Sequence, residues 1–171
     1  MRGLEFDGPI WWRVHCTGGP NILAWNAFHE NAPLLSPGVH SSAGVDTNRS
    51  EVCWAAADPT TALAEAFRAN HTIDRYRRQP YLTGLRFTRN LHLAHVALDS
   101  HAAQTGYLDD ESPSPDGLRY VSPLTGSTCI ALFPSAADAI PSRPVISQPL
   151  THPGLALRIA AVSQQLGYLV I

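Results

Sequence analysis

One carboxylate and one hydroxyl are the residues of this 171-residue chain best placed to do chemistry. Glu65 lies in a segment that follows the apolar run 51–56, and Ser122 ends a second apolar run, 118–121. A carboxylate on a rigid element stabilises a ribose carbon that becomes cationic as an N-glycosidic bond breaks, and a hydroxyl orients the sugar. The pair can therefore supply the groups that cleavage of an N-glycosidic bond to a ribose requires.

Each of these residues also has an ordinary structural interpretation. Glu65 fits a solvent-exposed helix glutamate paired with Arg68 three residues later. Ser122 fits a strand-end serine that bonds its own turn. Trp54, in the first apolar run, fits an aromatic side chain of the core. The sequence leaves both interpretations open at these three positions.

The elements that must position these groups are a strand, a capped turn and a helix. Residues 51–56 predict the strand, and Asp58 followed by Pro59 is typical of a helix N-cap and first helical position. The helix is predicted to reach about residue 70. Leu63 and Phe67 lie on its core-facing side, and Glu65 is rotated away from that side.

The rest of the pattern predicts a single α+β domain over residues 1–171 with mixed or antiparallel sheets and flanking helices. We expect a helix at 21–28, a hairpin from strands 81–87 and 91–98, and a loop at 31–50 that forms a candidate ligand lid. The other expected elements are strands or extended segments at 10–15, 118–121, 128–133, 144–147 and 168–171, a one-turn helix at 135–139 and a helix at 153–166.

Composition excludes several classes of function. The chain contains no lysine, so it has no P-loop lysine and no Schiff-base lysine. A formal net charge of −2 gives no electrostatic footprint for nucleic acid. The basic cluster 74–78 fits a solvated loop or, as a second interpretation, a phosphate or partner contact. His92 and His95 fall on opposite faces of a strand, so no metal site is expected.

The expected state and location of the chain follow from the same composition. The three cysteines, Cys16, Cys53 and Cys129, are widely spaced and odd in number, which favours free thiols. No apolar run has the roughly 20 residues that a membrane-spanning helix needs. The sequence therefore predicts a cytoplasmic protein with no membrane contact, and it leaves the oligomeric state open.

Taken together, these segments resemble the RES-domain family. The aromatic residue and glutamate of that family match Trp54 and Glu65, and its Gly-x-x-Tyr-x-Ser element matches Gly117 to Ser122. The opening Trp12-Arg-Val-His15 and the closing 167–171 are also similar, so the likeness covers nearly the whole chain. The resemblance implies a fold similar to that of ADP-ribosyltransferases of the diphtheria-toxin type.

The resemblance also implies a function, a substrate and a partner. RES domains degrade NAD as toxins of toxin–antitoxin pairs, and the expected partner is a helical Xre-like antitoxin that plugs the cleft. Glu65 would stabilise the oxocarbenium-like ribosyl centre, and Ser122 would hydrogen-bond the ribose or the carboxamide. Trp54 and Tyr120 would belong to the NAD site. The products would be nicotinamide and ADP-ribose, or its 1″-phosphate if phosphate is a co-substrate.

The chain departs from the family where an arginine is expected before the Trp54 strand. Residues 34–40 hold no arginine, and His40 and Arg13 are the candidates to contact NAD instead. Arg13 is equally consistent with a structural salt bridge. Losing a guanidinium contact to a pyrophosphate would cost roughly 1.5–3 kcal/mol. Three functions therefore stay open: an NAD-cleaving enzyme, an enzyme that uses another acceptor or nucleotide, and an inactive binding module.

Overall fold

The computed structural model describes residues 8–20, 22–30, 51–95 and 114–171. Within these ranges the chain forms ten strands, two α-helices and two short 3-10 helices. In order these are β1 (Trp11–Cys16), β2 (His29–Glu30), β3 (Glu51–Ala56), α1 (Pro59–Ala66), β4 (Thr72–Ile73), β5 (Pro80–Leu85), β6 (Leu93–His95), β7 (Gly117–Val121), β8 (Thr128–Leu132), a 3-10 helix (Pro134–Ala139), β9 (Ile146–Pro149), a 3-10 helix (Pro153–Leu155), α2 (Ala156–Leu166) and β10 (Leu169–Val170).

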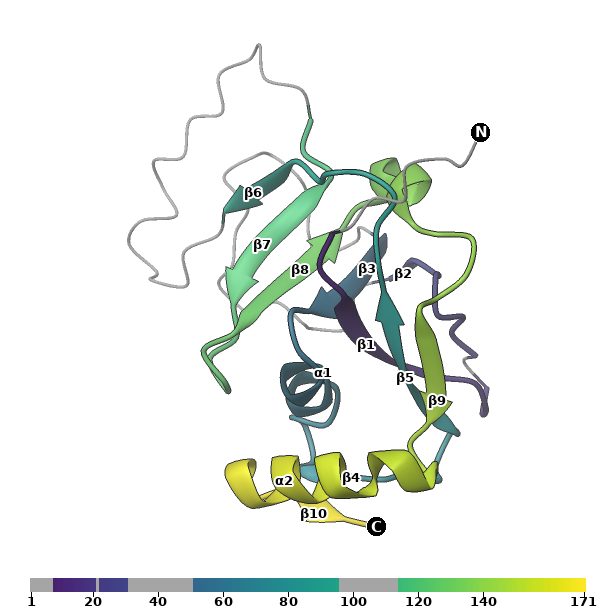
Figure 1. Cartoon of the computed structure of the whole chain (residues 1–171), viewed down its shortest axis with the longest axis vertical. Coiled ribbons are helices and arrows are strands. Elements are labelled where there is room, and N and C mark those ends of the chain that lie inside the picture. The colour runs from purple at the N-terminus through teal and green to yellow at the C-terminus, as the bar shows by residue number, and fades with distance from the viewer. Residues whose placement is uncertain (1–7, 21, 31–50, 96–113) are drawn as a thin grey trace.

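The described strands build one large sheet and one small one (Figure 1). The large sheet has the order β6-β7-β8-β3-β1-β5-β9, with β2 added beside β3. All its neighbours are antiparallel except β6 and β7. The small sheet pairs β4 with β10 in parallel. A mostly antiparallel sheet with few helices confirms the predicted α+β class.

The pairing of β1 with its two neighbours is unequal. Six residues of β1 pair with β5, from Trp11 opposite Leu85 to Cys16 opposite Pro80. The pairing with β3 is recorded at one position, Trp12 opposite Ala56. The sheet therefore opens between β1 and β3 beyond Trp12, and side chains rather than backbone bonds fill that gap.

The central strands β3 and β8 are buried on both faces. Trp54 and Ala56 of β3 pack into a core that α1 and α2 cover, while Cys53 and Ala55 point into a second core on the other face. Successive side chains of a strand face opposite ways, so a strand between two cores must be apolar throughout. This explains why the run 51–56 has no polar residue after Glu51.

Helix α1 begins as predicted and ends early. The Asp58 carboxylate accepts a 2.8 Å hydrogen bond from the Thr61 amide, and Pro59 takes the first helical position. The helix ends at Ala66 rather than near residue 70. The amides of Asn70 and His71 both bond the Phe67 carbonyl, which replaces regular helix with turns.

The predicted helix at 21–28 is wrong over its described residues, 22–28, which hold no helix. The guanidinium of Arg13 donates to the carbonyls of Trp25 and Ala27, and the Leu23 amide donates to the Cys16 carbonyl. These carbonyls and amides serve tertiary contacts. Hydrogen bonds with β1 therefore replace the helix that the local pattern predicts.

The predicted hairpin of 81–87 with 91–98 is also wrong. β5 lies between β1 and β9, whereas β6 lies beside β7 at the other end of the sheet (Figure 1). Arg89, in the expected turn, bonds Asp116 and Asp138 instead. The connection is thus held by distant carboxylates, and the two strands join different parts of the sheet.

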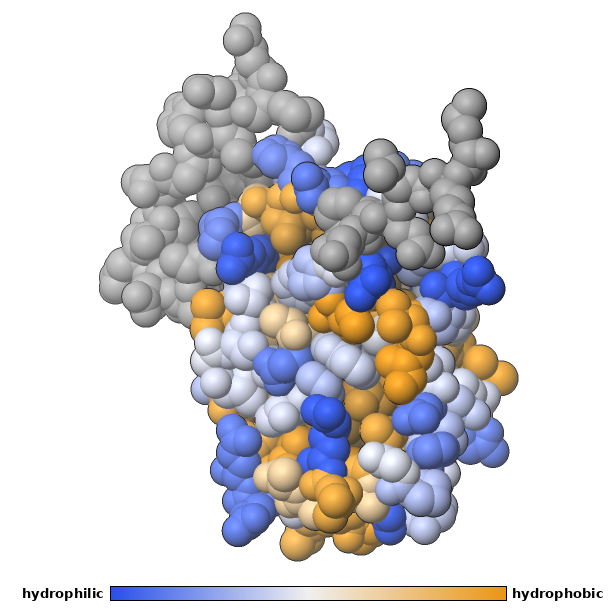
Figure 2. All heavy atoms as spheres, in the orientation of Figure 1, coloured by the Kyte–Doolittle hydropathy of each residue, from blue (hydrophilic) through white to orange (hydrophobic). Residues whose placement is uncertain are grey.

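The remaining elements largely follow the sequence. β7 and β8 coincide with the strands expected at 118–121 and 128–133, and they pair in antiparallel fashion. The predicted helix 153–166 appears as a 3-10 turn continued by α2 up to Gly167. The one-turn helix begins at Pro134, and Ser135 does not cap it. The candidate lid, 31–50, lies outside the described residues. Figure 2 shows hydrophobic residues in separate patches on one face, with hydrophilic residues between them.

Candidate active site

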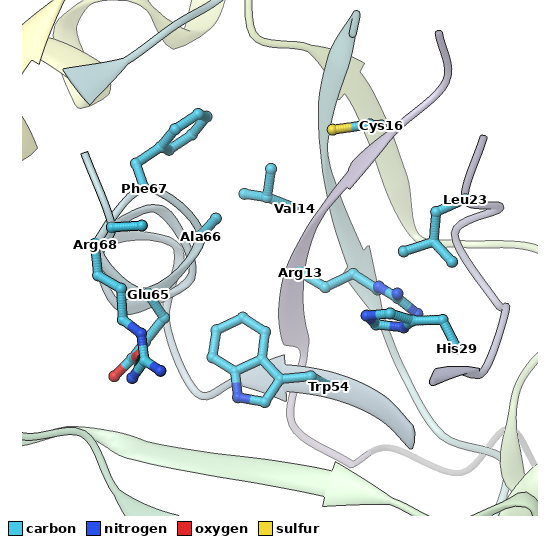
Figure 3. A pocket seen from close by; sticks show the side chains of 11 residues that line it. Arg13, Val14, Cys16, Leu23, His29, Trp54, Glu65, Ala66, Phe67 and Arg68 are labelled. Atoms are coloured by element: carbon cyan, nitrogen blue, oxygen red, sulfur yellow. Dashed lines mark hydrogen bonds and ion pairs between the residues drawn. The ribbon is translucent and has the colours of Figure 1, made fainter. Parts of the chain in front are cut away.

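A cavity of about 360 Å³ opens where α1 faces the gap between β1 and β3. Its walls come from β1, from the segment before β2, from Trp54 of β3 and from the end of α1 (Figure 3). This volume is within the usual range for small-molecule sites. The polar side chains that line the cavity are Arg13, His29, Glu65 and Arg68.

Glu65 lies in the wall of this cavity and is buried. The residue is 3% exposed, and its Oε1 accepts a 2.6 Å hydrogen bond from the Ser122 hydroxyl. Its Oε2 is 3.4 Å from Nη1 of Arg68. The interpretation of Glu65 as a solvent-exposed helix residue is therefore wrong, because the side of α1 that faces away from Leu63 and Phe67 is covered as well. The expected pair of Glu65 with Arg68 is present, but the Glu65 carboxylate is buried.

The turn between β7 and β8 covers the Glu65 side of α1. Thr61 and Glu65 are four residues apart and share one helix face. The Thr61 hydroxyl bonds Asp58 and is 2.7 Å from the Thr125 hydroxyl, just as Glu65 bonds Ser122. Two polar contacts, one helical turn apart, therefore fix this turn on the helix. The sequence signal that could have revealed this docking is the pair of polar residues at i and i+4.

Ser122 is positioned by its strand and by its own turn. It is 1% exposed, and its Oγ also accepts a 3.2 Å bond from the Leu124 amide. The structural interpretation of Ser122, a strand-end serine that bonds its own turn, is therefore confirmed, and the same hydroxyl also bonds Glu65. Gly117 allows β7 to lie close to β8, because a Cβ there would collide with the carbonyl oxygen of Ala131. The Gly-x-x-Tyr-x-Ser pattern thus has a packing reason in this chain.

Trp54 and Tyr120 meet beside the carboxylate. Trp54 is 5% exposed, lines the cavity and donates its indole N–H to the Tyr120 hydroxyl. In Figure 3 the Trp54 ring lies between Glu65 with Arg68 on one side and Arg13 with His29 on the other. Tyr120 is a core residue that supports Trp54 and is not among the residues that line the cavity.

Three groups around Glu65 are held in their neutral forms. Burial, and then the charge of Cys129, raises the pKa of Tyr120, and Glu65 adds to that rise. Burial and Glu65 raise the pKa of the Cys129 thiol to about 12. Burial and Glu65 also raise the pKa of Tyr168, whose hydroxyl donates to the Ala64 carbonyl. Glu65 therefore has these three uncharged groups near it, in addition to the Arg68 guanidinium that it pairs with.

Arg13 is a buried cation on the opposite wall. It is 2% exposed, and its Nη1 contacts the carbonyls of Trp25 and Ala27 and the Cys53 sulfur. Its Nε is enclosed and has no hydrogen-bond partner. In the described part of the chain no carboxylate pairs with it. The salt-bridge interpretation is therefore not what the described residues show, although Arg13 does hold the segment before β2 in place.

His29 lies beside Arg13 and, like it, has one enclosed nitrogen atom without a hydrogen-bond partner, Nδ1. Burial lowers the pKa of His29, and the Arg13 charge lowers it further. Sequence reasoning did not select His29, because a single histidine in the two-residue strand β2 gives no pattern. His40, the other histidine proposed for this wall, lies outside the described residues.

Among the described residues, no group of three or more His, Cys, Asp or Glu side chains lies close enough together to hold a metal ion. All three cysteines are free thiols, as predicted. Among the helices that the structure describes, none is long and apolar enough to cross a membrane.

Comparisons of this chain with models of protein families, with curated proteins and with solved structures find no match. The site must therefore be interpreted from its own geometry.

Proposed function

We propose that this protein cleaves the N-glycosidic bond between nicotinamide and ribose in NAD, with Glu65 as the catalytic carboxylate. The observation that carries the proposal is the position of Glu65: a buried carboxylate in the wall of a ligand-sized cavity, held at 2.6 Å by Ser122. A carboxylate held in this way stabilises the cationic ribosyl centre without reorganising during the reaction.

The number of carboxylates in the cavity wall supports this substrate. Glu65 is the one carboxylate among the described residues that line the cavity. Ordinary glycosidases use two, because the leaving oxygen must be protonated. Nicotinamide leaves NAD as a neutral molecule from a cationic ring, so no general acid is required. A single carboxylate, without a second one to act as a general acid, suits that leaving group.

The aromatic wall supports the same assignment. Trp54 offers a ring face to a planar pyridinium, and a cation over an indole is a favourable contact. Its N–H is already occupied by Tyr120, so the ring is fixed before a ligand binds. Tyr120 acts through Trp54 and is a positioning residue. Arg13 and His29 line the opposite wall of the cavity, and the positive charge of Arg13 favours an anionic part of the substrate there.

The direct test follows free nicotinamide after purified protein is mixed with NAD, with and without phosphate. Glu65→Gln keeps the size of the side chain and removes the charge, so we expect kcat to fall about a hundredfold or more. Glu51→Gln is the matched control, because Glu51 is exposed at the start of β3. Full activity in Glu65→Gln, or equal losses in both variants, would refute the assignment.

The acceptor and the biological setting belong to the same proposal. Products separated with phosphate present distinguish ADP-ribose from its 1″-phosphate, and hence water from phosphate as nucleophile. A RES-type fold, a toxin role and a helical antitoxin partner remain predictions from the resemblance. Expression in bacteria with a parallel measurement of intracellular NAD tests the toxin role, which is wrong if growth and NAD both stay level.

A second candidate function is a nucleotide-binding module without catalysis. Both oxygens of Glu65 already have partners within the protein, Ser122 and Arg68. A carboxylate used as a structural anchor would show the same contacts. This function predicts binding of NAD without release of nicotinamide, and the same assay combined with calorimetry separates the two.

A further inference from the structure

A second cavity, of about 570 Å³, adjoins the first. Cys16, Ala66 and Phe67 line both cavities, so the two share one wall. The rest of the second cavity is different in character. Its other walls hold the polar residues Asn70, Thr72, Asp74, Arg77 and Arg78 with the apolar Pro80 and Ile171. A ligand that extends past the shared residues would thus reach from Glu65 to a surface that carries two arginines.

Arg78 lines the second cavity together with Cys16, one of the residues that both cavities share. The side chain of Arg78 also passes over Gly19, where an added Cβ would come within 3.2 Å of its Cγ. No hydrogen bond or ion pair among the described residues occupies the Arg78 guanidinium.

The backbone around Arg78 is held in an unfavourable conformation. Arg78 has φ 63° and Gln79 has φ 48°, a left-handed region that side chains with a Cβ disfavour. The Thr17 and Gly18 amides hold this bend by donating to the Gln79 and Arg78 carbonyls. Backbone of this kind persists where the surroundings over-determine it, and it is frequent at ligand sites.

Asp74 completes the chemistry of this cavity. Its Oδ1 accepts the amides of Tyr76 and Arg77, which hold the carboxylate in place. These bonds lower the pKa of Asp74, and the Arg77 charge acts in the same direction. In the described part of the chain no hydrogen bond occupies its Oδ2. A fixed, ionised carboxylate is a good acceptor for the hydroxyls of a ribose.

We propose that the second cavity binds the non-reacting half of a dinucleotide, with Arg78 on the phosphates and Asp74 on the second ribose. The inference rests on the proposed function, since Glu65 defines which half reacts. It assigns the basic cluster 74–78 a role as a phosphate contact. It also makes the pyrophosphate lie beside Cys16, where the two cavities meet.

The test compares substrates that differ in the half that reaches Arg78. NAD has both halves, while nicotinamide riboside has the reacting half without a phosphate. We expect Arg78→Gln to raise KM for NAD about tenfold or more, with kcat unchanged and with no change for nicotinamide riboside. Arg143→Gln, an exposed arginine outside both cavities, is the matched control. Equal KM changes for the two substrates would overturn the proposal.

A binding experiment decides the inference even if no nicotinamide is released. ADP is titrated calorimetrically into the wild-type protein, Arg78→Gln and Arg143→Gln. Affinity lost in Arg78→Gln alone supports the second cavity as a nucleoside diphosphate site, and unchanged affinity or no ADP binding overturns it. Pyrophosphate titrated in parallel must bind more weakly than ADP, because equal affinity would show that no nucleoside is recognised there.

Discussion

The two adjoining cavities differ in how their charged groups are held. In the first, Glu65 and Arg13 are almost fully buried and their bonds come from side chains and carbonyls of distant segments. In the second, Arg77 and Arg78 are exposed, and Asp74 is held by the backbone of its own loop. The first is therefore built by tertiary packing, and the second by local chain geometry.

The difference assigns separate tasks to the two cavities. A buried carboxylate fixed by hydrogen bonds acts on charge that develops during a reaction, because its environment is already organised. Exposed guanidinium groups act on charge that the ligand already carries, and they affect binding more than the chemical step. Changes to Glu65 and Ser122 should therefore alter kcat, and changes to the arginines of the second cavity should alter KM.

The largest effect that sharpens this comparison, after Glu65→Gln, is expected from Ser122→Ala. The substitution removes a donor to the carboxylate at 2.6 Å. A hydrogen bond to a charged group contributes about 1.5–3 kcal/mol, so we expect kcat to fall about tenfold to a hundredfold. Steady-state kinetics with NAD measure it, and Ser142→Ala, in an exposed loop, is the control. A rise in KM with kcat unchanged would contradict the division of tasks.

A smaller effect is expected from Thr125→Val, which removes one of the two contacts that fix the β7–β8 turn on α1. The Thr61 hydroxyl keeps its bond to Asp58, whereas the Ser127 amide loses its 3.3 Å bond to the Thr125 hydroxyl. We expect the free energy of unfolding to fall by about 0.5–1.5 kcal/mol, measured by urea denaturation. Because Ser122 lies at the start of the same turn, kcat should fall as well. A stability loss without any change in kcat would show that the turn does not position Ser122.

A still smaller effect is expected from Trp54→Phe. The phenyl ring keeps an aromatic face in the first cavity but loses the indole N–H that bonds Tyr120. Cation–π contacts are weaker for Phe than for Trp, by a fraction of about 1 kcal/mol, so we expect KM for NAD to rise a few-fold. The same rise should occur with nicotinamide riboside, in contrast to Arg78→Gln. An effect restricted to NAD would move Trp54 to the phosphate-binding half.

The last prediction concerns the pH dependence of the free energy of unfolding, which is expected to be close to zero at pH 7. Burial lowers the pKa of His15 and His29 below the ordinary histidine value of 6.5. Below pH 6.5 the unfolded chain binds more protons at these sites than the folded protein, so the free energy of unfolding falls as pH drops. Urea denaturation at several pH values between 7.5 and 5 should show this slope, and His29→Gln should reduce it.

The carboxylates with lowered pKa set a different window for the same measurement. Asp58 and Asp116 have pKa values below 3.8, so the stability that they contribute is lost as the pH falls through their folded pKa. A loss of stability between pH 6.5 and 5 therefore reports the histidines and not these carboxylates. A flat profile in that window would contradict the assignment of neutral histidines beside Arg13.

Features of this structure that depend on residues close together in the sequence were predictable, and features that depend on distant residues were not. The Asp58 cap, the Pro59 start and the strands β7 and β8 follow from neighbouring residues and were predicted from them. The hairpin of β5 with β6 was not predictable in this way, because Arg89 bonds carboxylates that are 27 and 49 residues away. The helix at 22–28 failed for the same reason, since Arg13 takes its carbonyls.

The candidate site divides along the same line. The sequence by itself determined the residue types: one carboxylate on a capped helix, a serine at a strand end and an arginine cluster at 74–78. Only the tertiary structure decided that Glu65 is buried against Ser122, that Arg13 faces it across a cavity and that Arg78 lines a second cavity beside the first. The physical reason is that charge and propensity are properties of single residues, whereas burial and cavities come from the packing of segments far apart in the chain.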